Sequence, residues 1–273
     1  MGRAAELEWR KIPELFRLKE LASPPKKLFS LGSLKADIFW NCVAVVGSRR
    51  MTEYGRRALE TIVPRLVFEG KTVISGFMYG VDQYAHELCI ENGGKTIAVL
   101  GWGINLPFKG SDIKLAEKII KSQGLILSEW EEQQGTLWTF PTRNRIVAAL
   151  ADEIIVVEAA AKSGALITAR LGAKLKRKIW AVPGPITSRT SEGTNALIAA
   201  GLAQMWLGNS VNLKIDYGSD PLLNLLENES LTANEIARKM NKNISEIGAQ
   251  LSLLTLEGSL TERDGKYFVN NAG

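Results

Sequence analysis

The sequence contains one histidine, two cysteines and no long hydrophobic run, and each shortage excludes a class of site or structure. Because His86 is the single histidine, one chain cannot assemble a metal site that needs two or three imidazole ligands. Cys42 and Cys89 lack a metal-like spacing and imply no disulfide framework, which favours a reducing, cytoplasmic environment. No run of about 18 apolar residues occurs, so we expect no membrane span. The N-terminus mixes acidic and basic residues without an apolar core, so we expect no signal peptide.

Charge is distributed unevenly along the 273 residues, whose formal net charge is +5. Residues 214–273 hold 6 Lys+Arg and 9 Asp+Glu, a net charge of −3, which leaves +8 on residues 1–213. A basic main domain beside an acidic tail favours an anionic partner for the first part. The hydrophobic content of 45% is typical of a globular protein, and the length allows one large domain and one small one.

Short apolar runs alternate with amphipathic stretches through the middle of the chain. The runs lie at 43–46, 72–74, 96–100, 125–127, 154–157 and 179–182. Strands this uniformly apolar are buried on both faces, so the sequence predicts a Rossmann-like, doubly wound parallel sheet covered by helices, over residues 42–212. The helices long enough for right-handed crossovers are expected at 54–69, 80–92, 112–122, 143–150 and 164–176.

The two ends of the chain have other patterns. Residues 1–41 are polar and rich in proline, and they predict a lead-in segment with one short helix packed outside the sheet. Glycine, asparagine, aspartate and proline between 208 and 221 indicate a linker. Residues 219–273 then predict three helices, at 221–228, 232–240 and 244–257, and a hairpin that turns at 264–265, which is the order of a winged-helix domain.

Two details of this C-terminal domain bear on its role. Thr232 and Glu235 have the spacing of a capping box at the start of the second helix. The third helix contains Glu246 and Glu257 and no lysine or arginine, so we do not expect it to read duplex DNA. A protein contact or a regulatory role fits its acidic surface better.

The loops that follow the predicted strands are the candidate site, because ligands of doubly wound sheets bind at the carboxyl ends of the strands. These loops place small residues, arginines and a lysine at predicted helix N-termini, where backbone N–H groups and the helix dipole attract anions. A guanidinium adds a planar, five-donor fork for phosphate. The residues predicted to contact the ligand are Gly47, Ser48, Arg49, Arg50, Ser75, Gly76, Phe140, Arg143, Asn144, Arg145, Lys162, Ser163, Gly164 and Asn195.

Several of these residues have a second interpretation. The loop at Gly47 is alternatively an ordinary glycine turn whose two arginines are solvated, and such a turn needs no ligand. Phe140 is either a stacking platform for an unstacked base or a core aromatic. Arg143 and Arg145 oppose the dipole if they lie in the first turn of their helix, which favours an external anion. For His86 we expect a structural role, beneath a helix that Asp82 caps.

The same loops lack the motifs of two familiar nucleotide sites. The residues after Gly47 do not form GxGxxG, and no GxxxxGK[ST] occurs, so NAD use and nucleotide hydrolysis are disfavoured. No general base or nucleophile stands out among the loops. We therefore expect no catalysis and no cofactor, and a row of cations suits a chain of phosphates better than one reacting centre.

Several long motifs resemble those of a known family. GSRRMTEYG, SGFMYGVDQYAH, FPTRNRIVAAL, VVEAAAKSGALITA and SEGTNALIAAG follow one another in the order found in the DNA-processing protein A family (DprA, also called Smf). The similarity extends from about residue 12 to residue 206, and the tail resembles that family's winged helix. The chain looks like a short form without the N-terminal helical domain. Where the family usually has a small residue and an arginine, this chain has Met78 and Tyr79.

The resemblance implies a function and partners. It predicts a cytoplasmic homodimer that binds single-stranded DNA, protects incoming DNA in natural transformation and recombination, and loads the RecA recombinase. The family's phosphate-contacting arginine corresponds to Arg49. Two alternatives remain open: a nucleotide-binding or base-releasing protein of the related Rossmann-like group, whose PGGxGTxxE motif is split and incomplete here, and a nucleotide-sensing interaction module.

Overall fold

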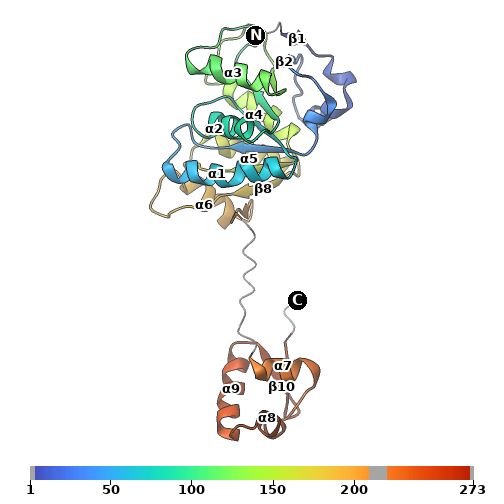
Figure 1. Ribbon diagram of the computed structural model, residues 1–273, viewed down its shortest axis with the longest axis vertical. Coiled ribbons are helices and arrows are strands. Elements are labelled where there is room, and N and C mark those ends of the chain that lie inside the picture. Colours follow the sequence, from blue (N-terminus) through green and yellow to red (C-terminus); the bar gives the residue numbers. More distant parts are fainter. Residues whose placement is uncertain (1–3, 209–219, 271–273) are drawn as a thin grey trace. The chain divides into compact units, whose positions relative to one another are not determined.

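The computed structural model describes residues 4–208 and 220–270 (Figure 1). The chain divides between Asn209 and Ser210 into two compact units, each of which is described by itself. Most of the linker predicted between 208 and 221 lies outside the described residues.

The first unit is built on a nine-stranded sheet with the order β1-β2-β6-β5-β4-β3-β7-β8-β9. Each neighbouring pair from β6 to β9 in this order is parallel, whereas β1–β2 and β2–β6 are antiparallel. The strands are β1 (Ala5–Glu6), β2 (Phe29–Gly32), β3 (Cys42–Val46), β4 (Thr72–Ser75), β5 (Thr96–Val99), β6 (Leu125–Ser128), β7 (Glu153–Val156), β8 (Lys178–Ala181) and β9 (Gln204–Met205).

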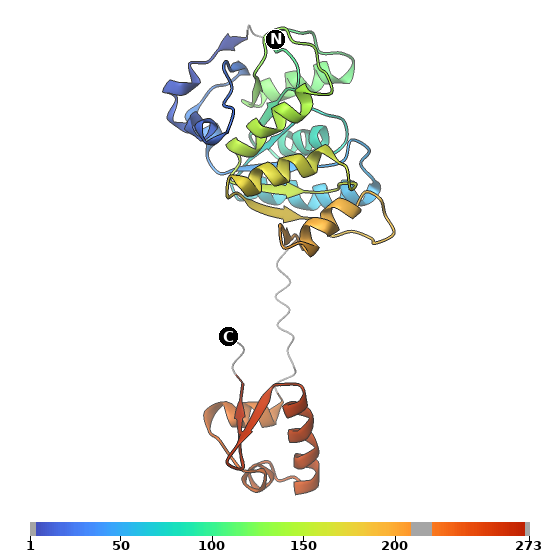
Figure 2. The ribbon, with the colours of Figure 1, turned by 180° about the vertical axis from the view of Figure 1, so that it is seen from behind.

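Helices cover both faces of this sheet. α1, α2 and α3 lie on the face seen in Figure 1, and α4 and α5 lie on the face seen in Figure 2. Alternate residues of β3 separate accordingly, since Val43 and Val45 pack with α1 and α2 whereas Ala44 and Val46 pack with α4 and α5. The helices are α1 (Glu53–Phe68), α2 (Val81–Glu91), α3 (Ser111–Lys121), α4 (Thr139–Leu150), α5 (Gly164–Lys174) and α6 (Glu192–Ala199).

The predicted doubly wound sheet is confirmed, and the predicted strands agree with the observed ones to within a residue at each end. One helix differs. α4 begins at Thr139, whereas the sequence places its start near 143. Pro141 sits inside the first turn without cost, because the first N–H groups of a helix have no intrahelical acceptor. Arg143 therefore lies in the second turn.

The N-terminal segment does not pack outside the sheet, so that prediction is wrong. β2 adds to the sheet edge by pairing with β6, and β1 pairs with β2. Three short 3₁₀ helices, η1 (Trp9–Lys11), η2 (Pro13–Glu20) and η3 (Ala36–Phe39), complete the segment. Trp9, Leu15 and Leu18 are buried in the main core, so burial of apolar side chains fixes the segment to the domain.

The strand order places the topological switch point between β3 and β7. From β3 the chain runs outward through β4, β5 and β6, and then returns to place β7 on the other side of β3. Loops from both halves of the sheet therefore diverge at this point, which leaves a crevice at the carboxyl ends of the strands.

The second unit has the predicted element order. It contains α7 (Pro221–Asn228), α8 (Ala233–Met240), α9 (Ile244–Leu256) and the hairpin of β10 (Leu260–Arg263) and β11 (Lys266–Val269). The capping box of Thr232 and Glu235 is present. The hairpin turns at Asp264 and Gly265, both with positive φ, as a type I′ turn requires.

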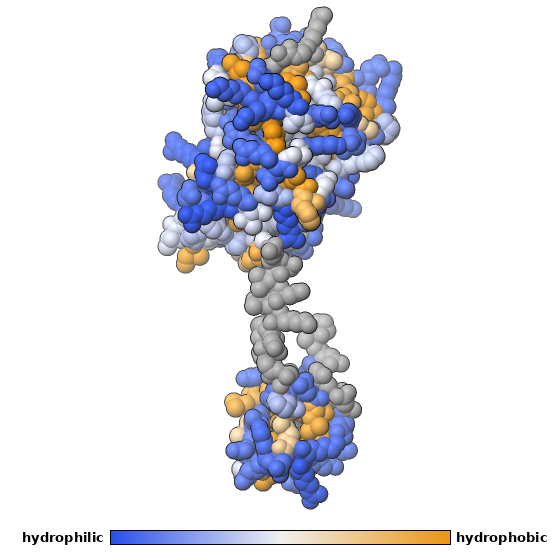
Figure 3. All heavy atoms as spheres, in the orientation of Figure 1, coloured by the Kyte–Doolittle hydropathy of each residue, from blue (hydrophilic) through white to orange (hydrophobic). Residues whose placement is uncertain are grey.

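Hydrophilic residues cover much of the face that α1, α2 and α3 present, with patches of hydrophobic residues between them (Figure 3). No helix among residues 4–208 and 220–270 is long and apolar enough to cross a membrane.

Candidate functional site

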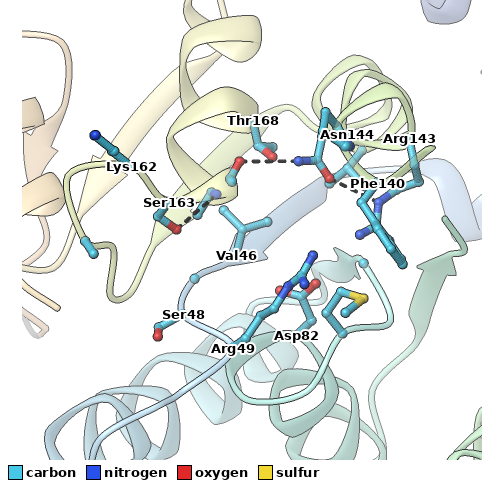
Figure 4. Close-up of a pocket in the computed structure, with 18 of the residues that line it drawn as sticks. Val46, Ser48, Arg49, Asp82, Phe140, Arg143, Asn144, Lys162, Ser163 and Thr168 are labelled. Carbon is cyan, nitrogen blue, oxygen red and sulfur yellow. Dashed lines mark hydrogen bonds between the residues drawn. The ribbon is translucent and has the colours of Figure 1, made fainter. Parts of the chain in front are cut away.

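A pocket of about 380 Å³ lies at the switch point, formed by the loops after β3, β4 and β7 and by α4 (Figure 4). We call it the switch-point pocket. It is lined by Val46, Gly47, Ser48, Arg49, Gly76, Met78, Asp82, Leu137, Phe140, Pro141, Arg143, Asn144, Val147, Ala160, Lys162, Ser163, Gly164, Ala165 and Thr168. Ten of the fourteen predicted ligand residues are thus brought together, from segments more than a hundred residues apart in the sequence.

The loop after β3 supplies Arg49. Gly47 and Ser48 carry the chain out of the sheet, and the Ser48 hydroxyl accepts a hydrogen bond from the Arg50 N–H at 3.0 Å. The exposed Arg49 side chain turns toward α4, where its guanidinium lies 5.2 Å from the centroid of the Phe140 ring. A cation held over an aromatic face in this way keeps its donors available.

A buried carboxylate anchors the start of α1 next to this loop. Glu158, which follows β7, accepts hydrogen bonds from the Thr52 N–H at 2.9 Å and the Thr52 hydroxyl at 2.5 Å. The Thr190 hydroxyl donates a third, at 3.2 Å. Because Thr52 caps α1, this acidic side chain compensates the positive end of the helix and fixes the strand-end loop.

α4 supplies a buried arginine. Arg143 is 3% exposed; its Nε donates to Asn144 Oδ1 at 3.1 Å and its Nη1 donates to the carbonyl of Val99, at the end of β5. Nη2 has no hydrogen-bond partner in the described part of the chain. Burial lowers the pKa of Arg143 to about 10, Arg49 adds to this effect, and Asp82 acts in the opposite direction. Arg143 therefore keeps its charge at neutral pH.

Gly76 lets two charged groups approach the end of β4. A Cβ at this position would lie 2.3 Å from Asp82 Oδ2 and 2.5 Å from both terminal nitrogens of Arg143. Side chains cannot be accommodated at such distances, so the close approach requires glycine. Burial raises the pKa of Asp82 to about 6, against the opposing effect of Arg143.

The loop after β7 forms the opposite side of the pocket. Ser163 caps α5, and its hydroxyl accepts from the Ala165 N–H at 3.3 Å. Asn144 connects this loop to α4 by donating to the Gly164 carbonyl at 3.3 Å. The exposed Lys162 points away from the other labelled side chains in Figure 4, so its ammonium can reach a ligand that extends beyond the pocket.

His86 has the structural environment that the sequence suggests. Its Nδ1 lies 2.6 Å from the Thr96 hydroxyl and its Nε2 lies 2.6 Å from the Gly76 carbonyl. Burial lowers its pKa to about 4, so the ring is neutral at physiological pH. The suggested helix cap by Asp82 is wrong, because α2 begins after Gly80 without a side-chain cap.

Four predicted ligand residues do not line the pocket. Arg145 binds both oxygens of Glu129, at 2.5 and 2.6 Å, and with Arg143 in the second turn the dipole argument for an external anion no longer holds. Ser75 is fully buried and donates to the Val45 carbonyl at 2.6 Å. The side-chain amide of Asn195 is bound to the backbone of Gly184: its oxygen accepts from the Gly184 N–H at 3.1 Å and its nitrogen donates to the Gly184 carbonyl at 3.0 Å. Arg50 is exposed outside the pocket.

Nine lining residues are not among the predicted ligand contacts, and two of them, Asp82 and Leu137, differ most from the role that the sequence suggests. The sequence suggests a helix cap for Asp82, whereas the structure places its carboxylate beside Gly76, close to the guanidinium of Arg143. Leu137 is 92% exposed and precedes α4. Met78 lines the pocket, whereas its neighbour Tyr79 is exposed and does not.

Among residues 4–208 and 220–270, no group of three or more His, Cys, Asp or Glu side chains is placed to hold a metal ion. The polar groups that line the switch-point pocket are dominated by cations and backbone N–H groups at a helix start. This arrangement suits an anionic oxygen ligand such as phosphate.

Comparison of the sequence with family models gives a match over residues 7–214 to the model described as DNA recombination-mediator protein A. The chain belongs to this family. It is 37% identical over 213 residues to Protein Smf of Synechocystis, and the aligned region covers 76% of this chain and 52% of that protein. It is 35% identical over 201 residues to DNA processing protein DprA of Streptococcus pneumoniae, covering 73% and 70%. The chain thus spans only about half the length of the first of these relatives.

Solved structures of the family have the same fold. DNA processing protein A from Helicobacter pylori, described for its single-stranded DNA binding mode, superposes with a TM-score of 0.66 and 32% identity, over 74% of this chain and 90% of that one. The X-ray structure of DprA from Streptococcus pneumoniae gives a TM-score of 0.64 and 35% identity, over 70% and 66%.

Proposed function

We propose that the chain binds single-stranded DNA at the switch-point pocket, without catalysis. One observation carries the proposal: Arg49, Arg143 and Lys162 line a single pocket at a helix start, next to the ring of Phe140. Phosphate oxygens satisfy the guanidinium and N–H donors, and a partly exposed aromatic ring offers a face for an unstacked base. The membership of the family and the single-stranded DNA binding of the Helicobacter pylori relative support this ligand.

The pocket suits a strand rather than a free nucleotide. Lys162 lines it, is exposed and points away from the other labelled side chains (Figure 4), so a chain of phosphates can extend from the pocket along this side. This chain retains two parts of the base-releasing motif, Pro183-Gly184 and Gly193-Thr194, and neither part lines the pocket. A base-releasing enzyme would need these residues at the ligand.

Further functions are proposed on family membership. We infer that the protein acts in the cytoplasm as a homodimer, protects incoming DNA during transformation and recombination, and loads the RecA recombinase. Light scattering tests the dimer. Strand exchange by RecA on DNA covered with a single-strand-binding protein, with and without this chain, tests the loading.

The decisive experiment is fluorescence anisotropy with a labelled polythymidine oligomer and a matched duplex across a salt series. We expect the single strand to bind more tightly and its affinity to fall steeply with salt, because cations are released from the phosphates. Arg49→Ala should weaken binding to every sequence similarly and reduce the salt slope by about one. Arg57→Ala, an exposed residue on α1 outside the pocket, is the matched control. Equal affinity of Arg49→Ala and the unmodified protein would refute the site.

A further inference from the structure

Asp82 is the single acidic residue among those that line the switch-point pocket. It lies in the first turn of α2, is 8% exposed, and faces Arg143 across Gly76. The approach of both groups to Gly76 places the carboxylate next to the guanidinium without a direct ion pair. An acidic group in this position reduces the positive charge that an entering phosphate meets.

Four groups from the surrounding elements act on the ionisation of Asp82. Arg143 projects from α4 and Arg49 from the loop after β3, and both favour the charged carboxylate. Ser75 at the end of β4 and the main chain of Met78 act in the same direction. Burial opposes all four and dominates, which leaves the pKa of Asp82 near 6, so a modest change in charge shifts the carboxyl between its two forms.

An entering phosphate makes such a change. Its negative charge lies among the same cations that stabilise the Asp82 carboxylate, so it competes for them and repels the carboxylate. A like charge within a few ångströms in a largely buried site disfavours the ionised acid. The pKa of Asp82 therefore rises further when the pocket is filled, and the carboxyl takes up a proton.

We propose that the switch-point pocket binds phosphate together with one proton, which Asp82 accepts, so that Asp82 sets the pH dependence of ligand affinity. The inference rests on the proposed function, since it concerns the same pocket. It adds a residue that acts against the ligand when ionised and becomes neutral when the ligand is bound. Affinity for a phosphate chain then rises as the pH falls, by up to tenfold per pH unit where one proton is taken up.

Other titrating groups do not account for this behaviour. His86 is one turn along α2, but its pKa near 4 keeps it neutral over the range in question. Arginine and lysine remain charged. Polythymidine has no group that titrates near neutral pH, so the ligand itself contributes nothing.

The test measures affinity for polythymidine from about pH 8 to about pH 5.5, a range that brackets the Asp82 transition. The unmodified protein should bind roughly tenfold more tightly at the acidic end. Asp82→Asn, which is permanently neutral, should bind more tightly at the alkaline end and show little pH dependence. Asp37→Asn removes one charge at the opposite end of the sheet, where Asp37 pairs with Lys95, and should behave like the unmodified protein.

Proton uptake by the unmodified protein provides a second readout that needs no variant. Calorimetric binding enthalpies in buffers with different ionisation enthalpies, at about pH 6.5, should reveal uptake of about half a proton per bound strand. No uptake, or the same pH dependence in Asp82→Asn, overturns the inference while leaving the DNA site intact. Absence of binding at every pH overturns the proposed function itself.

Discussion

The guanidinium of Arg49 lies over the ring of Phe140, 5.2 Å from its centroid. The two residues come from opposite sides of the switch point, one after β3 and one in the first turn of α4. Phe140 also packs edge-on against Trp102, with the centroids 6.4 Å apart. The ring is therefore both a packing element and a support for the cation, so the two interpretations that the sequence leaves open are compatible.

A double-mutant cycle of Arg49→Ala and Phe140→Leu tests this relationship. If the ring positions the guanidinium, the two substitutions should be less than additive in their effect on the free energy of polythymidine binding. We expect a coupling of about 0.5–1 kcal/mol, the value of an exposed cation–π pair. Phe140→Tyr keeps the aromatic face and should lose little. Strict additivity would show that the contact does not position Arg49.

Gly76→Ala should disturb the protein at the end of β4. The added Cβ would meet Asp82 and Arg143 at 2.3 and 2.5 Å, so both buried groups must shift. We expect a loss of about 1–3 kcal/mol in the free energy of unfolding, measured in urea, together with weaker DNA binding. Gly164→Ala is the control for stability, since its Cβ would meet nothing closer than 4.0 Å. A stable Gly76→Ala protein with normal affinity would contradict the geometry.

Glu158→Gln should loosen the start of α1. The carboxylate accepts three hydrogen bonds, two of them from the helix cap Thr52, and an amide presents only one oxygen acceptor and no charge. We expect the free energy of unfolding to fall by about 1–3 kcal/mol. Thr52→Ser retains both donors and should remain close to the unmodified protein. Equal stability of Glu158→Gln would mean that the carboxylate is dispensable to the cap.

The sheet was predictable because its strands are buried on both faces and carry continuous apolar runs, such as 43–46 and 154–157. β2 (FSLG) follows a polar, proline-rich stretch and lacks the continuous apolar run of the central strands, so no local pattern distinguishes it from a loop. Its place in the sheet depends on pairing with β6, which is a long-range contact. Local pattern carries no information on such a partner.

The site was predictable where a residue type and a strand end coincide, as at Arg49 and Lys162. It was not predictable where tertiary partners decide the role. Arg145 belongs to the motif from which ligand-binding arginines are expected, but in the structure its guanidinium is paired with the carboxylate of Glu129. Asp82 resembles a helix cap in the sequence, and its closeness to Arg143 depends on the fold, which brings both side chains to Gly76 at the end of β4.

His86 should make stability depend on pH. Burial lowers its pKa to about 4 in the folded protein, against about 6.5 in an unfolded chain. The unfolded chain therefore takes up a proton first as the pH falls, so the contribution of neutral His86 is present above about pH 6.5 and is lost toward pH 4. At about pH 5 the folded protein has lost about 2 kcal/mol of its free energy of unfolding through this histidine.

The comparison of unmodified protein with His86→Asn in urea unfolding isolates this contribution, because every other titrating group is present in both proteins. At neutral pH the variant should be the less stable one, since it loses the hydrogen bonds to Thr96 and Gly76. The difference should shrink by about 2 kcal/mol between about pH 7 and about pH 5, since only the unmodified protein loses stability through this histidine. A difference that stays constant over this range would mean that His86 titrates as it does in the unfolded chain, and that it is not held neutral by burial.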